Sequence, residues 1–148
     1  RHGATGDRQA DRRYHGGELQ ALCLFAVETL DILRGEGVPV FPGALGENFT
    51  TEGLDYRRVR VGDVYRTASR VEFEITKPRV PCATIQVYSA GIIKRLWGPS
   101  VPWGESGFYA RVNGEGTARA GDDLELLRPG AAPPPPFTRK AWATYATP

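Results

Sequence analysis

Cysteine is scarce in this sequence, and long hydrophobic runs are missing. The two cysteines, Cys23 and Cys82, are too few for a disulfide framework, and Cys23 lies in an apolar run, which favours a reducing cytoplasm. No stretch approaches the roughly 20 apolar residues that span a bilayer, and the polar residues 1–13 do not resemble a signal peptide. These absences predict a soluble cytoplasmic protein with no membrane contact.

The familiar motifs of several enzyme classes are also missing. Only His2 and His15 are present, which argues against a histidine-rich zinc centre. The sequence has no P-loop and no Gly-x-Gly-x-x-Gly, Cys-x-x-Cys, Gly-x-Ser-x-Gly or His-Glu-x-x-His segment. Its 19 basic and 17 acidic residues are mixed along the chain, so the net charge of +2 does not indicate a nucleic-acid surface and permits small anionic ligands.

What the sequence does contain fits one mainly β domain. A chain of 148 residues is long enough for one hydrophobic core and too short for two ordinary domains. The 18 glycines and 12 prolines indicate many turns and short strands rather than a helical bundle. The apolar pattern predicts strands near residues 49–51, 59–65, 71–76, 108–112 and 122–127 and a short helix at 92–97.

Residues 18–34 allow two interpretations. Their apolar positions fit a single helix that Gly35 and Gly37 would end. The denser run 21–26 also fits a buried strand that leads into a shorter helix at 27–34, and periodicity alone leaves both open.

Cys82 is the candidate reactive residue. It ends a loop, residues 77–82, that two prolines stiffen, and the nearby Lys77 and Arg79 would lower the pKa of its thiol. A thiolate binds metals or attacks substrates, whereas a lone cysteine is often a small buried hydrophobe, so both roles stay open for Cys82. Cys23 has only apolar neighbours, and we expect it in the core.

Two glycine-rich segments are candidate ligand loops. His15-Gly16-Gly17 follows two arginines, and its glycine peptides can point successive N–H groups at an anion, or can form a simple turn. Gly46-Glu47-Asn48 has the same two interpretations, because asparagine both caps turns and contacts ligands.

Five segments, in this order, resemble the MOSC domain (molybdenum cofactor sulfurase C-terminal domain) of the small stand-alone bacterial type, over about Gly6 to Leu127. They are Gly6-Asp7-Arg8-Gln9-Ala10-Asp11, Arg13-Tyr14-His15-Gly16-Gly17, Gly46-Glu47-Asn48-Phe49-Thr50, Gly62-Asp63 and Pro78-Arg79-Val80-Pro81-Cys82. The resemblance implies a mainly β fold, a MOSC-type β-barrel with a few short helices, in which residues 21–26 form a strand before a short helix. It also implies that the first strands of the barrel are missing, so that residues 1–128 form an N-terminally truncated MOSC domain and 129–148 a proline-rich linker and tail.

The resemblance also implies the contents of the site. Cys82 would ligate molybdenum or carry sulfur, and the cofactor would be the molybdenum cofactor, molybdopterin. The residues expected to surround that cofactor are Arg13, His15, Gly16, Gly17, Glu47, Asn48 and Arg79.

The function implied in this way is the reduction of N-hydroxylated purines or related small molecules. Reduction would occur at the metal, which Cys82 would tune, and a separate flavin or iron–sulfur reductase would supply the electrons. Two alternatives stay open. One is a sulfur carrier that receives sulfur on Cys82 from a pyridoxal-phosphate-dependent desulfurase, and the other is a non-catalytic barrel that binds a partner through its edge strands. The sequence does not fix the oligomeric state, so a homodimer stays open too.

Overall fold

The computed structural model describes residues 4–5 and 17–131, which form a mainly β fold with a few short helices, as expected. Its elements are η1 (Glu18–Gln20), β1 (Leu22–Ala26), α1 (Val27–Gly35), β2 (Phe49–Thr51), β3 (Val64–Thr67), β4 (Glu72–Pro78), η2 (Ala83–Val87), α2 (Ile92–Leu96), β5 (Phe108–Gly114) and β6 (Leu124–Arg128). Across the described ranges, no helix has the length and apolar character that crossing a membrane requires.

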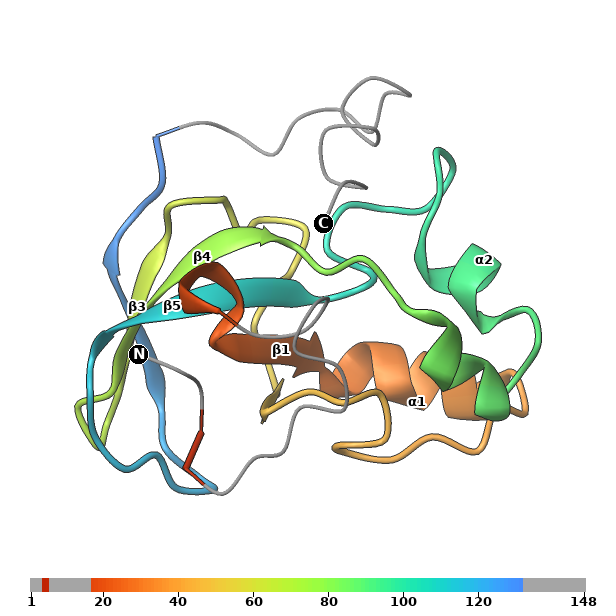
Figure 1. Ribbon diagram of the computed structural model, residues 1–148, viewed down its shortest axis with the longest axis horizontal. Coiled ribbons are helices and arrows are strands. Elements are labelled where there is room, and N and C mark those ends of the chain that lie inside the picture. The colour runs from red at the N-terminus through yellow and green to blue at the C-terminus, as the bar shows by residue number, and fades with distance from the viewer. Residues whose placement is uncertain (1–3, 6–16, 132–148) are drawn as a thin grey trace.

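The strands form one half-barrel sheet in the order β2-β1-β5-β4-β3-β6. β1 and β2 run parallel, and the other neighbouring strands run antiparallel. Figure 1 shows α1 and α2 together at one end of the molecule, with β3 and β6 at the opposite end. The expectation that the first barrel strands are missing stays a prediction.

The segment at residues 18–34 is a strand followed by a helix, so the interpretation as a single helix is wrong. All five residues of β1 are buried, and the chain passes directly from Ala26 into α1 (Figure 1). A strand that is buried on both faces reads as a continuous apolar run, which is why helical periodicity also fitted it. The order that the family resemblance implied is therefore confirmed.

Two hydrophobic clusters cover the two faces of β1. The first lies on the inner face of the sheet and the second lies beneath the helices, with Phe25 as its contribution from β1. The buried residues of the first cluster are Leu22, Leu24, Ala26, Tyr56, Val59, Tyr65, Phe73, Ile75, Phe108 and Ala110. Those of the second are Phe25, Leu30, Leu33, Val40, Leu45, Ile85, Ile92 and Leu96.

An irregularity between β4 and β5 changes which side chains face outward. Ile75 pairs with Ala110, but the next recorded pair is Lys77 with Tyr109, so Thr76 is an extra residue in β4. Such bulges redirect the side chains that follow them. Here the bulge turns Lys77 to the outer face and Pro78 to the inner face opposite Phe108. β4 therefore continues to Pro78, so the first two residues of the segment 77–82, which was expected to be a loop, belong to the strand.

Candidate functional site

Cys82 lies at the start of η2, half-buried, where the stiff Pro78–Cys82 segment leaves β4. Burial acts to raise the pKa of its thiol, but other interactions outweigh it and the pKa of Cys82 is lowered. These are hydrogen bonds from the hydroxyl and N–H of Thr84, the positive charge of Arg79, and the N–H of Ile85. The predicted thiolate character therefore has a structural basis, with Arg79 as the basic neighbour that contributes.

Arg79 is buried beside this thiol, with only 4% of its surface exposed. Its Nη2 donates to the Leu45 carbonyl, while its Nη1 has no hydrogen-bond partner within the described residues. Two hydrogen bonds hold the backbone of Arg79. Its N–H donates to Gly107 O at 2.9 Å, and its carbonyl accepts from Ser106 Oγ at 2.6 Å. A buried cation held by these contacts thus lies close enough to Cys82 to lower its pKa.

The floor of the site is a row of side chains across three strands. In the sheet register, Tyr109 of β5 lies between Cys23 of β1 and Lys77 of β4. Lys77 Nζ lies 5.7 Å from the centre of the Tyr109 ring, and the Tyr109 hydroxyl lies within hydrogen-bonding reach of Arg79. Burial raises the pKa of Tyr109 to about 12 and that of Cys23 to about 11, so both are neutral at physiological pH.

Glu47 and Asn48 lie in the loop before β2, and their described contacts hold that loop in place. The carboxylate of Glu47 accepts from Gly43 N–H at 2.7 Å, from Leu45 N–H at 3.2 Å and from Thr50 Oγ1 at 3.0 Å. Asn48 Oδ1 accepts from Cys23 N–H at 2.8 Å, and its own N–H donates to the Cys23 carbonyl. The loop thereby places the Leu45 carbonyl where it accepts a hydrogen bond from Arg79. Cofactor contact by Glu47 or Asn48 stays a prediction.

The glycine-rich segment is described only at its last residue. Gly17 is the N-cap residue that precedes η1, and the carbonyl of Leu19 in η1 accepts a hydrogen bond from Thr76 Oγ1 at the bulge. The other residues expected at the cofactor, Arg13, His15 and Gly16, lie outside the described residues.

Sequence reasoning missed two residues that contact the site. The first is Tyr109, whose position is detectable in hindsight, since alternation along β5 places it opposite to the buried Phe108 and Ala110. The other is Thr84, whose hydroxyl supports the Cys82 thiolate; a hydroxyl residue two positions after the cysteine was its only signal.

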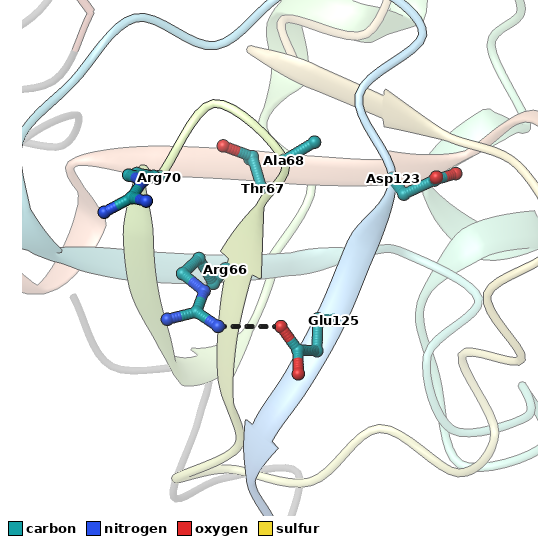
Figure 2. A pocket seen from close by; sticks show the side chains of 6 residues that line it. All are labelled: Arg66, Thr67, Ala68, Arg70, Asp123 and Glu125. Atoms are coloured by element: carbon teal, nitrogen blue, oxygen red, sulfur yellow. Dashed lines mark hydrogen bonds and ion pairs between the residues drawn. The ribbon is translucent and has the colours of Figure 1, made fainter.

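A separate cavity of about 430 Å³ opens at the far end of β4 from Cys82. Figure 2 shows its lining, in which Arg66 Nη2 and Glu125 Oε2 form an ion pair at 2.9 Å between β3 and β6. The lining residues are Arg66, Thr67, Ala68, Arg70, Asp123 and Glu125. Its lining contains no thiol, and its two acidic residues offset its two arginines.

Comparison with known proteins decides the family, because the MOSC domain model matches residues 11–125. The chain belongs to the MOSC domain family. This match covers the Cys82 loop, the Glu47-Asn48 loop and all six strands except the end of β6.

Proteins similar to this MOSC chain include bacterial and fungal ones. The uncharacterized protein YflK of Bacillus subtilis is 35% identical over 126 residues, which cover 84% of this chain and 56% of YflK. A protein of Gibberella moniliformis named "Reductase" is 30% identical over 129 residues, covering 84% of this chain and 22% of that protein. The crystal structure of YiiM from Geobacillus stearothermophilus superposes with a TM-score of 0.65 at 31% identity, over 76% of this chain and 56% of that one. The MOSC chain thus spans about half the length of the bacterial relatives it matches.

Proposed function

We propose that this MOSC chain binds the molybdenum cofactor through Cys82 and reduces N-hydroxylated purines or related small molecules. A separate flavin or iron–sulfur reductase would supply the electrons. The observation that carries the proposal is the pairing of a thiol of lowered pKa, Cys82, with a buried arginine, Arg79, whose Nη1 has no partner among the described residues.

These two residues fit the group chemically. A thiolate is a soft ligand of the kind that thiophilic metals prefer. An arginine that is 4% exposed is costly unless an anion or an acceptor satisfies it, and a pterin cofactor carries a phosphate. When bound, the cofactor would supply the two-electron redox chemistry, and the protein would bind and orient it.

Different residues would contribute to cofactor binding in different ways. Cys82 offers its thiolate from a half-exposed position, and Thr84 orients the sulfur through its hydroxyl and N–H. Leu45 and Ser106 fix the guanidinium and the carbonyl of Arg79, so that Nη1 keeps its direction in the absence of a ligand. Such preorganisation reduces the entropy that binding costs.

The comparisons support an oxidoreductase within this family. The Gibberella moniliformis relative is named "Reductase", and the chain aligns with only 22% of it, which leaves room in that protein for further domains. A redox role at the MOSC domain with electrons from elsewhere is compatible with that arrangement.

The test is the molybdenum content of the protein after expression in a host that makes the cofactor. We expect near-stoichiometric molybdenum in the wild type, loss of the metal in Cys82→Ser, and retention in the control Lys94→Gln, which changes an exposed lysine of α2. Reduction of an N-hydroxylated purine by chemically reduced protein should follow the metal content. Wild-type protein without molybdenum, or equal molybdenum in Cys82→Ser, would refute the proposal.

A sulfur-carrier function is the second candidate, and the half-exposed thiolate of Cys82 is the observation that favours it. A persulfide forms when such a thiolate accepts sulfur from a pyridoxal-phosphate-dependent desulfurase. Incubation with a cysteine desulfurase and cysteine would then add one sulfur to Cys82, seen as a mass shift that Cys82→Ser lacks.

A further inference from the structure

A second candidate ligand site is the cavity of about 430 Å³ that Figure 2 shows. It is lined by the end of β3, the turn that follows β3 and the start of β6. Cavities of this size hold small organic molecules. The cavity lies at the far end of β4 from Cys82, so a ligand bound here would be separate from the proposed cofactor.

One ion pair in the cavity leaves one cation and one anion without a partner. Arg66 Nη2 contacts Glu125 Oε2 at 2.9 Å, so these two charges satisfy each other. The other two charged lining residues are Arg70 and Asp123, and within the described part of the chain neither side chain has a recorded ion pair or hydrogen bond. Figure 2 shows them well apart, with the ion pair between them in this view. The cavity therefore offers a free guanidinium on one side and a free carboxylate on the other.

The carboxylates closest to this turn in the sequence are engaged elsewhere. Glu72 Oε1 lies 3.8 Å from Arg66 Nη1. The carboxylate of Asp122 accepts from the N–H of Arg119 at 3.0 Å. Neither of them supplies Arg70 with a partner.

Arg70 also has a backbone conformation that favours glycine. Its N–H donates to the Thr67 carbonyl at 2.8 Å and closes the turn, and its φ is +69°. Turns of this kind usually have glycine at the left-handed position, because an L side chain is strained there. Among the described residues, Arg70 is the one non-glycine residue with positive φ. A strained arginine beside a cavity points to a use for its side chain, since the backbone alone would favour glycine.

We propose that the cavity binds a small ω-amino acid, whose carboxylate contacts Arg70 and whose ammonium contacts Asp123. A guanidinium binds a carboxylate through two parallel hydrogen bonds, and a carboxylate accepts charge-assisted hydrogen bonds from an ammonium. Because the two side chains lie apart in Figure 2, the two charges of the ligand must be separated by a chain that an α-amino acid lacks. Both side chains are exposed, so each contact contributes modestly to the affinity.

The first experiment compares ligands by calorimetric titration of the full chain at pH 7.5 and constant ionic strength. The zwitterions are glycine, γ-aminobutyrate and ε-aminocaproate. We expect one of the two longer ones to bind at least about threefold more tightly than glycine. Butyrate and butylamine each carry one of the two charges of γ-aminobutyrate, and both should bind more weakly than the best zwitterion by a similar factor. Equal binding of butyrate would mean a simple anion site and would overturn the proposal.

Substitutions then test the two side chains. Arg70→Gly removes the guanidinium and relieves the backbone strain, so the Kd should rise at least about threefold while the midpoint of urea unfolding also rises. Asp123→Asn should weaken binding to a similar degree, and it keeps the hydrogen bond from the Ala68 N–H to the Asp123 carbonyl. The control Lys94→Gln, in α2, should bind as the wild type does. A lower urea midpoint in Arg70→Gly would show that the side chain stabilises the turn, and would contradict the argument from strain.

Backbone amide resonances locate the bound ligand. The tightest zwitterion should shift the amide resonances of Ala68 and Arg70 and leave that of Thr84, beside Cys82, unchanged. Binding of none of the three amino acids by the wild type, or equal affinity in wild type, Arg70→Gly and Asp123→Asn, would refute the proposal. These measurements involve neither Cys82 nor molybdenum, so their failure is distinguishable from a failure of the proposed function.

Discussion

The pKa values of the two cysteine thiols are shifted in opposite directions because their surroundings differ. Burial raises the pKa of the Cys23 thiol to about 11, since its strand is covered on both faces. Cys82 experiences the same desolvation to a smaller degree, and the hydrogen bonds from Thr84 together with the Arg79 charge lower its pKa. At neutral pH the Cys23 thiol is therefore protonated within the core, and Cys82 is the more acidic of the two thiols.

Thr84 provides the residue-scale prediction. Thr84→Val keeps the shape of the side chain but removes the hydroxyl that bonds to Cys82, so the pKa of Cys82 should rise and its alkylation profile should shift to higher pH. The measurement is the rate of iodoacetamide modification of each cysteine between pH 6 and 10, followed by mass spectrometry. Modification of Cys23 ahead of Cys82, or identical profiles for wild type and Thr84→Val, would contradict the structure.

Residues near each other in the chain could be assigned to the site from the sequence, and residues far apart could not. Cys82 and Arg79 share one proline-stiffened segment, so their proximity was predictable. Tyr109 meets them only through the register of β5 against β4, and that register depends on a one-residue bulge that no local pattern reveals. The internal hydrogen bonds of Glu47 likewise depend on how its loop closes.

At the scale of elements, the approach of β5 to β1 depends on Gly107. Its φ is +82°, and a Cβ added there would lie 2.2 Å from the Leu24 carbonyl oxygen. The Gly107 carbonyl accepts a hydrogen bond from the N–H of Arg79. The same glycine therefore allows β1 and β5 to approach and helps to position Arg79. No side chain can occupy this position without moving one of the two strands.

We therefore predict a large difference between two glycine-to-alanine variants. Gly43 has a similar φ of +88° but open space around it, so Gly43→Ala should cost about 1–2 kcal/mol, from backbone strain alone. Gly107→Ala adds the overlap with β1 and should cost at least about 3 kcal/mol. Urea unfolding of both variants gives the comparison, and equal costs would show that β1 and β5 do not approach as closely as described.

The elements themselves were largely predictable where the apolar pattern was clear. The alternation of Val71, Phe73 and Ile75 predicted β4, and the short helix at 92–97 and the strand at 108–112 are confirmed as α2 and β5. The segment 18–34 could not be settled in this way, because a strand buried on both faces loses the alternation that distinguishes it from a helix. Only the order of motifs along the chain favoured the correct interpretation.

At the scale of the whole molecule, the site lies where the two hydrophobic clusters meet. β1 contributes Leu24 to the inner cluster and Phe25 to the cluster beneath the helices, and Cys23 precedes them on the outer side. The floor of the site is therefore part of the core. Ionisation of Cys23 would place a charge inside that core, so it is linked to unfolding of the entire domain.

This linkage predicts the alkaline stability of the protein. A pKa that folding raises from 9.0 to about 11 gives stability that is fully present below pH 9 and is lost as the pH rises through 11. Two units correspond to about 2–3 kcal/mol. In Cys23→Ala this dependence is absent, while groups that do not interact with Cys23 titrate in both proteins and cancel in the comparison. Urea unfolding under reducing conditions at pH 8, 9.5 and 11 should therefore show the stability advantage of the wild type over Cys23→Ala shrinking by about 2–3 kcal/mol across this range. A constant difference would mean that the Cys23 thiol can ionise without opening the domain, and that the floor of the site is not part of the core.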